Sequence, residues 1–396
     1  MTAFEKDIVS LVRAALTGEA PTLSPEADYA RIYHFGLKQQ IIYMLNAGLC
    51  MVDGFEESAA APQFLQAACA AMAAALRQQQ EIGKIRAAFS ARGIDFMPLK
   101  GTLMRDLYPM PEMRQMGDAD ILIREEQIDA ITAVMQELGY TKAVGDVYEV
   151  VWSKSGALRV EFHTQLASER NQDIRSYFAA EYVWARAVKG DGSVYHMTPE
   201  DELIFDFAHF VKHFRSSGAG LRNIVDLYVF LQKHRDLNEA YIGTQLKKLD
   251  FYRFYLHVLD TLRCWFDGAE ATEATDCITG LLFAGGIYGD AETAHQSTAI
   301  RYRKQYKFGW AVKFLQLVFP GFRTQRKRYP ILEEFPVLYP FSLIYHWFEV
   351  LFFRSASIGK AIGDSAEIRG DYGQERYAQL RSVGLKPEKA FEKKNT

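Results

Sequence analysis

A short stretch, Asp-Ala-Asp-Ile-Leu-Ile at 118–123, most constrains how this chain can fold. It has the alternating pattern of a β-strand, in which successive side chains point to opposite faces. Asp118 and Asp120 therefore share one face, whereas the alanine and the two isoleucines share the other. Neighbouring carboxylates repel each other unless a cation lies between them. The stretch thus predicts a strand that is buried on one face and carries a metal site on the other.

A second strand is predicted at 158–163 (Leu-Arg-Val-Glu-Phe-His), with Glu161 and His163 on its polar face. Carboxylate ligands with no thiolate nearby suit Mg²⁺ or Mn²⁺ better than zinc. Asp118, Asp120 and Glu161 together could hold two such ions about 3.5–4 Å apart, an arrangement that serves phosphoryl or nucleotidyl transfer. His163 is a candidate for supporting these ligands or for positioning substrate.

The corner formed by Lys100, Gly101 and Thr102 precedes the aspartate strand. It is expected to begin a helix, whose free backbone N–H groups and positive dipole end can hold a triphosphate. Lys100 and Arg114 are expected to neutralise phosphate charge, and arginine is suited to a bidentate contact. We therefore interpret these four residues as a nucleotide-binding set.

The order of a Gly-Thr corner, an Asp-x-Asp strand and a strand with one central glutamate resembles the nucleotidyltransferase superfamily that shares the DNA polymerase beta palm. More closely, the chain is similar to a bacterial nucleotidyltransferase family with an LKG…LYP…R…DxDLL signature. The matching residues are Leu99–Gly101, Leu107–Pro109, Arg114, Asp118–Asp120, Glu161–His163, His209, His213, Arg222 and Asp226, together with 329–330 and 338–340. Thr102 and Ala119 stand where the superfamily usually has serine and isoleucine.

The patterns and the resemblance together imply an α+β fold, with a small mixed β-sheet core between N-terminal and C-terminal helical regions. We expect an N-terminal helical region at 1–92 and a nucleotidyltransferase core at 93–195. A C-terminal helical domain should follow at 196–360, and a polar tail at 361–396.

The helix expected after Thr198 places His209 and His213 on one face. A His-x₃-His pair can bind zinc. Alternatively, the two side chains hydrogen-bond to each other and to Asp226 where helices pack. His209 and Asp226 are candidates for facing the cleft and positioning substrate, and Arg222 is a candidate phosphate contact.

The overall composition is that of an ordinary globular protein rather than a generic nucleic-acid binder, with a net charge of −3 and a pI near 6.3. The four cysteines are scattered without metal-ligand spacing, which favours reduced thiols in the cytoplasm. The first residues are partly acidic and lack the apolar segment of a signal peptide. We therefore expect a cytoplasmic protein.

Two C-terminal stretches allow more than one interpretation of what the protein binds. The stretch 293–332 combines basic and aromatic residues, which could bind RNA, acidic lipid or an anionic acceptor, or could pair with the acidic residues at 267–292. The apolar segment 337–353 contains Pro340, His346 and Glu349, so a buried or interfacial helix is favoured over a membrane span. No stable binding to nucleic acid or membrane is expected.

The sequence thus predicts that the protein transfers a nucleoside monophosphate from a nucleoside triphosphate, with ATP the expected donor, to an acceptor hydroxyl. Pyrophosphate would be released with the help of Mg²⁺ or Mn²⁺. A small soluble acceptor is favoured. The alternatives are an inactive nucleotide-binding scaffold and a toxin-like enzyme that modifies tRNA or protein.

Overall fold

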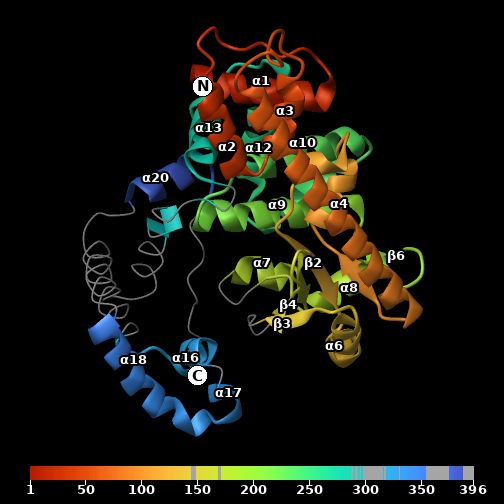
Figure 1. Cartoon of the computed structure of the whole chain (residues 1–396), viewed down its shortest axis with the longest axis vertical. Coiled ribbons are helices and arrows are strands. Elements are labelled where there is room, and N and C mark those ends of the chain that lie inside the picture. Colours follow the sequence, from red (N-terminus) through yellow and green to blue (C-terminus); the bar gives the residue numbers. More distant parts are fainter. Residues whose placement is uncertain are drawn as a thin grey trace. The chain divides into compact units, whose positions relative to one another are not determined.

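The computed structural model describes two compact units, both of which are rich in helix (Figure 1). The described residues are 1–143, 149–167, 171–286, 289, 293, 294, 296, 297, 315, 318–329, 331–353 and 374–386. The first unit comprises 1–214, 218–289 and 383–385, and the second comprises 215–217, 290–382 and 386–396. The four-part division expected from the sequence stays a prediction.

A five-stranded sheet forms the centre of the first unit. Its strand order is β1 (Phe96–Pro98), β2 (Asp118–Ile123), β5 (Arg159–His163), β4 (Glu149–Ser153) and β3 (Thr141–Ala143). The central pair of β2 and β5 is parallel, and every other pair in this sheet is antiparallel. The sheet is therefore mixed, and the expected α+β fold class is confirmed.

One face of the sheet is covered by helices α4 (Ala61–Ala91) and α6 (Ile128–Glu137). Phe89 of α4 and Val134 of α6 are fully buried there against Ile121 and Phe162 of the two central strands. The predicted alternation is confirmed, because the alanine and both isoleucines of β2 are buried while its two aspartates remain partly exposed. Burial of this apolar face leaves the acidic face toward the rest of the unit.

Further helices complete the first unit. They are α1 (Ala3–Thr17), α2 (Tyr29–Gln39), α3 (Ile42–Leu49), α5 (Gly101–Met104), α7 (Gln172–Tyr177), α8 (Ala180–Arg186), α9 (Pro199–Ser216), α10 (Arg222–Lys233), α11 (Glu239–Lys248), α12 (Tyr252–Leu262) and α13 (Glu273–Ala284). Short strands β6 (Val188–Lys189) and β7 (Tyr195–His196) form a separate pair. Thr198 caps α9, the helix expected to follow it, because its hydroxyl accepts a hydrogen bond from the amide of Asp201 at 3.3 Å.

The buried side chain of Gln39 fixes where α10 begins. Its amide nitrogen donates to the carbonyl oxygens of Leu282 and Gly285, and its oxygen accepts from the amide of Leu221 at 3.0 Å. Satisfying all of these buried polar groups ties α2 to the end of α13 and the start of α10. The start of α10 is thereby fixed in position, and with it the residues of α10 that face the acidic side of the sheet.

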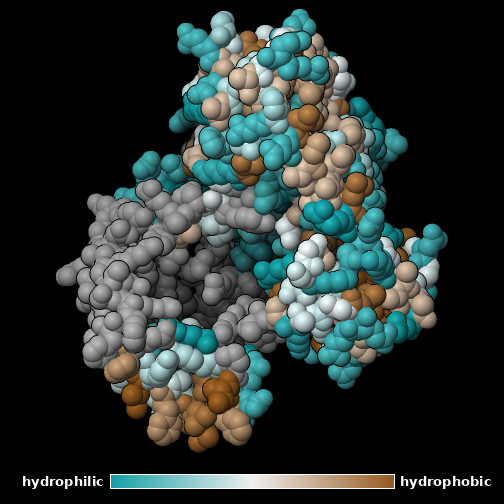
Figure 2. Space-filling model, viewed as in Figure 1, coloured by the Kyte–Doolittle hydropathy of each residue, from teal (hydrophilic) through white to brown (hydrophobic). Residues whose placement is uncertain are grey.

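The second unit contains α16 (Phe322–Arg328), α17 (Ile331–Glu334), α18 (Tyr339–Phe353) and α20 (Gln374–Ser382). Within the basic-aromatic stretch 293–332, residues 295, 298–314, 316, 317 and 330 lie outside the described residues. Helix α18 occupies the apolar segment and exposes Phe341, Ile344 and Phe348. Hydrophobic residues gather on the surface where this helix lies in Figure 2. Among the described residues, no helix has both the length and the apolar character needed to span a membrane. Helix α20 lies within the stretch expected to be a polar tail.

Candidate active site

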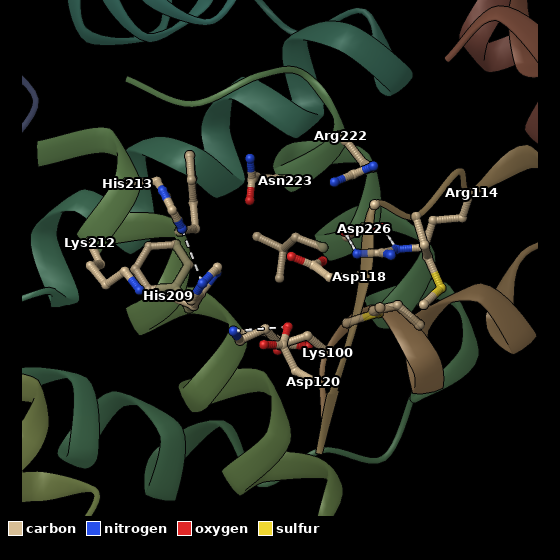
Figure 3. Close-up of a pocket in the computed structure, with 18 of the residues that line it drawn as sticks. Lys100, Arg114, Asp118, Asp120, His209, Lys212, His213, Arg222, Asn223 and Asp226 are labelled. Carbon is tan, nitrogen blue, oxygen red and sulfur yellow. Dashed lines mark hydrogen bonds and ion pairs between the residues drawn. The ribbon is translucent and has the colours of Figure 1, made fainter. Parts of the chain in front are cut away.

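The acidic face of the sheet borders a cavity of about 260 Å³ (Figure 3). Eleven of the residues singled out in the sequence line it: Lys100, Gly101, Arg114, Asp118, Asp120, Glu161, His163, His209, His213, Arg222 and Asp226. Thr102 is buried. The cavity walls come from the sheet, from the segment between β1 and β2, and from α9 and α10. Residues from distant parts of the sequence therefore share one concave site.

The register of the central strands brings the predicted carboxylates together. Asp120 of β2 stands directly beside Glu161 of β5, and Leu122 stands beside His163. Neighbouring strands lie about 4.8 Å apart. The structure thereby supplies a contact that the sequence left undefined, namely which carboxylate of β2 adjoins the carboxylate of β5.

Asp120 is paired with two nitrogen groups. Lys100 donates to its Oδ2 at 3.2 Å, and His163 Nε2 lies 2.7 Å from its Oδ1. Burial alone would raise the pKa of Asp120, but Lys100 and His163 hold that pKa well below its usual value. Asp120 is therefore a carboxylate throughout the neutral pH range, held in place before any ligand binds.

The backbone at Lys100 is strained. Its φ of 45° and ψ of −116° are sparsely populated for a residue with a side chain. Such a conformation costs about 1–3 kcal/mol and persists only where the surroundings enforce it. Here the amide of the preceding residue, Leu99, donates to the Asp120 carbonyl at 3.0 Å. The corner thus stays against β2, with the ammonium group of Lys100 beside the Asp120 carboxylate.

Glu161 has a second acidic neighbour, Glu149 of β4, which the sequence analysis missed. Arg159 contacts Glu161 at 2.8 Å and Glu149 at 4.0 Å, and both glutamates line the cavity. Burial, then the charge of Glu149 and that of Asp118, raise the pKa of Glu161 to about 7. Position 149 carried only one signal in the sequence, an acidic residue in an otherwise largely apolar stretch.

The group that could hold a metal ion includes a histidine. Asp120, Glu161 and His163 each offer one ligand atom, and these atoms all lie within 4.8 Å of one another. The sequence had placed Asp118 in this set and His163 behind it. Burial and the charge of Asp120 raise the pKa of Asp118, so a bound cation would stabilise the ionised carboxylate of Asp118 as well. Oxygen donors with one imidazole suit Mn²⁺ as well as Mg²⁺.

We expect the metal-free protein to become less stable as the pH rises from about 5 to 7. The pKa of Glu161 is 4.5 in the unfolded reference and about 7 in the fold, so the folded state binds the extra proton in that window. The free energy of unfolding then falls with rising pH. Added Mg²⁺ or Mn²⁺ should restore it at pH 7, because the cation binds only the folded site. Thermal unfolding across this range, with and without metal, measures the effect.

The Glu161→Gln variant is the control for this pH dependence. Glutamine does not titrate, so the slope should become shallower and the stabilisation by metal should shrink. A wild-type stability that is flat between about pH 5 and pH 7 would contradict the assignment of a raised pKa to Glu161.

Arg114, expected to contact phosphate, is instead bound to a protein carboxylate. Its Nε and Nη2 each donate to Asp226 of α10 at 2.8 Å, and the hydroxyl of Tyr108 donates to the same carboxylate at 2.6 Å. Burial, then the charge of Asp226, raise the pKa of Tyr108 well above its usual value, so the hydroxyl keeps its proton. Asp226 thus joins α10 to the segment between β1 and β2.

Gly101, which the sequence suggested as a nucleotide-binding residue, also has a packing role. A Cβ atom at Gly101 would lie 2.5 Å from Nη1 of Arg114. Because Asp226 fixes that guanidinium, a side chain at Gly101 would have to displace the guanidinium.

The buried hydroxyl of Thr102 has no hydrogen-bond partner among the residues that the structure describes. Helix α5, which begins at Gly101, is only four residues long.

Helix α9 supplies a wall of nitrogen groups. His209 and His213 hydrogen-bond to each other through their Nε2 atoms at 3.1 Å, which agrees with the non-metal alternative, although Asp226 is bound elsewhere. Burial, then the charge of Lys212, lower the pKa of His213 to about 3, so this imidazole is neutral near pH 7. Lys212 of the same helix, which was not singled out in the sequence, also lines the cavity.

Arg222 of α10 lines the cavity and is hydrogen-bonded to two other segments of the chain. Its Nη1 donates to the side chain of Gln40 at 3.1 Å and to the carbonyl of Gln115. The neighbouring Asn223 also lines the cavity and was missed in the sequence, where a single asparagine on a helix carries no distinctive signal. Arg222 therefore links α10 to the segment that leads into β2.

A mixed sheet with clustered carboxylates beside a cation-lined cavity suits phosphoryl or nucleotidyl transfer, because the carboxylates can hold divalent cations. A family model described as "uncharacterised nucleotidyltransferase" matches residues 25–267, more than half of the 396-residue chain, and the protein belongs to that family. The matched region contains every candidate site residue. The predicted resemblance and the expectation of a transferase are confirmed.

The curated proteins gave no significant match. Among solved structures, the chain resembles the solution structure of the antibiotic-resistance factor ANT(2'')-Ia, at 13% sequence identity and a TM-score of 0.32. That similarity covers 49% of this chain and 100% of the other.

Proposed function

We propose that this nucleotidyltransferase moves a nucleoside monophosphate from a nucleoside triphosphate to an acceptor hydroxyl, with Mg²⁺ or Mn²⁺ bound by Asp120, Glu161 and Asp118 or His163. The observation that supports it best is the parallel register of Asp120 with Glu161 beside the strained Lys100 corner. A divalent cation bound there would neutralise phosphate charge and favour ionisation of the acceptor hydroxyl.

The residues of the chain would contribute orientation and charge. The acceptor oxygen bonds to the α-phosphorus, its proton passes to solvent, and the bond from that phosphorus to the bridging oxygen breaks, so pyrophosphate leaves with the electron pair. Lys100, held beside Asp120 at 3.2 Å, would offset negative charge on the phosphates. His163 would keep the Asp120 carboxylate oriented through its 2.7 Å contact.

For the donor and acceptor we propose ATP and a small soluble hydroxyl compound, with neither nucleic acid nor membrane as a stable partner. The net charge of −3 supports this choice. Two basic residues of α16 also have partners: Arg326 faces Glu333 at 3.7 Å, and Arg328 lies 2.9 Å from His346. A cytoplasmic location is supported by the four cysteines, all described, which form no disulfide.

The test is to incubate the protein with Mg²⁺ or Mn²⁺, each nucleoside triphosphate in turn, and a cell extract. Mass spectrometry should find an acceptor whose mass has grown by one nucleoside monophosphate, together with released pyrophosphate. Nucleotide binding without pyrophosphate release from any triphosphate would favour the inactive scaffold. Modification of tRNA or of a protein would favour the toxin-like alternative.

A further inference from the structure

Asp206 is a carboxyl group of the cavity that the proposed reaction does not use. It lies on α9 and lines the cavity, and the residue as a whole is partly exposed. Both of its side-chain oxygens are nevertheless buried, and neither has a hydrogen-bond partner among the described residues. Leaving a buried polar group without a partner costs stability, so native folds keep few such groups. Asp206 is therefore a candidate for contact with a bound molecule.

The cations whose charges act on Asp206 are occupied by other carboxylates. Arg114 donates twice to Asp226, and Lys100 donates to Asp120 at 3.2 Å. Burial and neighbouring carboxylates raise the pKa of Asp206 well above its usual value, which favours its neutral form. A neutral carboxyl group still offers an oxygen that accepts a hydrogen bond. The group is thus suited to an uncharged N–H or O–H donor.

The helical wall that carries Asp206 is largely apolar. Four apolar residues of α9 and α10 also line the cavity: Leu203, Phe207, Leu227 and Phe230. Under the proposed function the metal ligands of β2 and β5 hold the phosphates, which leaves this wall for another part of a substrate. Phosphate oxygens would also gain no hydrogen bond from an acceptor oxygen. An apolar wall with one acceptor instead fits a flat ring that carries an N–H donor.

We propose that Asp206 accepts a hydrogen bond from the amino group of the adenine ring of ATP, with apolar side chains of α9 and α10 against the ring. This inference rests on the proposed function. Because no hydrogen bond to a described residue holds the carboxyl group, rotation about its side-chain bonds brings an oxygen into the cavity without breaking such a contact. Asp206 would thereby favour a nucleobase that carries an amino group.

Two nucleotides that differ only in the amino group test the proposal. Calorimetric titrations with Mg²⁺ would compare α,β-methylene ATP with the α,β-methylene triphosphate of purine riboside, which lacks the amino group. The wild-type protein should bind the ATP analogue about 5–100-fold more tightly, the usual effect of one hydrogen bond to a buried partner. Asp206→Leu should remove this difference. Asp206→Asn should keep most of it, because the amide oxygen still accepts.

Inorganic pyrophosphate, which has no nucleobase, is the control ligand, and its affinity should be unchanged in both variants. Asp236→Leu, at an exposed aspartate outside the cavity, is the matched control protein and should bind every probe like the wild type. Should leucine perturb the fold, Asp206→Ala provides a second variant without the acceptor oxygen. It should also remove the difference between the two nucleotides.

Several results would overturn the role of Asp206 while leaving the proposed reaction intact. They are equal binding of the two nucleotides by the wild type, a difference that persists in Asp206→Leu and Asp206→Ala, and a complete loss of the difference in Asp206→Asn. Unchanged nucleotide affinity with loss of transfer to an acceptor from cell extract would assign the carboxyl to the acceptor instead. If the wild type binds neither pyrophosphate nor any nucleoside triphosphate, the proposed function fails and this inference fails with it.

Discussion

Replacing Asp120 with asparagine is expected to lower nucleotidyl transfer by about 10³-fold or more. Its carboxylate is the one member of the acidic cluster that stands beside Glu161 and also contacts Lys100 and His163. Asparagine has no charge to offer a cation. Its NH₂ group would also face either the Lys100 ammonium or the His163 ring, and an ammonium cannot accept a hydrogen bond.

The same change should destabilise the metal-free protein by about 1.5–3 kcal/mol, the usual range for hydrogen bonds to a charged group. The pKa of Asp120 is lower in the fold than in the unfolded chain, so its ionised form stabilises the fold at neutral pH. Asp118→Asn should behave differently. Burial and Asp120 raise the pKa of Asp118, so removing its charge should leave stability unchanged or improved while activity is lost.

Product formation and urea denaturation at neutral pH would measure both effects. Asp129→Asn, at an exposed aspartate of α6, is the matched control and should retain activity. Full activity of the Asp120 variant would remove this carboxylate from the catalytic set. If the variant were more stable than wild type, repulsion within the cluster would outweigh the contacts with Lys100 and His163.

The second large effect is expected at the buried ion pair between Arg114 and Asp226. Arg114→Met should lower the free energy of unfolding by about 3–5 kcal/mol, because Asp226 would be left as a buried charge with Tyr108 as its remaining partner. The double variant Arg114→Met with Asp226→Leu should recover much of this loss, since no buried charge is stranded. Chemical denaturation of the single and double variants measures the coupling.

An exposed pair provides the comparison. Arg92 and Glu137 form an ion pair on the surface, and Arg92→Met should change stability by only about 0–1 kcal/mol. If Arg114 were instead a phosphate ligand, as the sequence suggested, Arg114→Met would weaken nucleotide binding with little effect on folding. A stable Arg114→Met protein with weakened pyrophosphate binding would therefore refute the structural role.

The candidate acidic cluster was accessible from the sequence because strand alternation is a local property of the backbone. Asp118 and Asp120 share a face wherever their strand lies, and the buried alanine and isoleucines fix which face that is. The mixed sheet followed from the order of strand-like and helix-like segments, and the family from the Lys-Gly and Asp-x-Asp motifs.

Only the tertiary structure decided which charges meet. Arginine is a residue type that often binds phosphate, but helix packing places Asp226, more than a hundred residues later in the chain, against Nε and Nη2 of Arg114. Glu149 and Lys212 belong to no recognisable motif. Glu149 reaches the cavity through the register of β4, and Lys212 through the orientation of α9. The partner of a charged side chain depends on distances between elements, and residue type and spacing along the chain do not encode those distances.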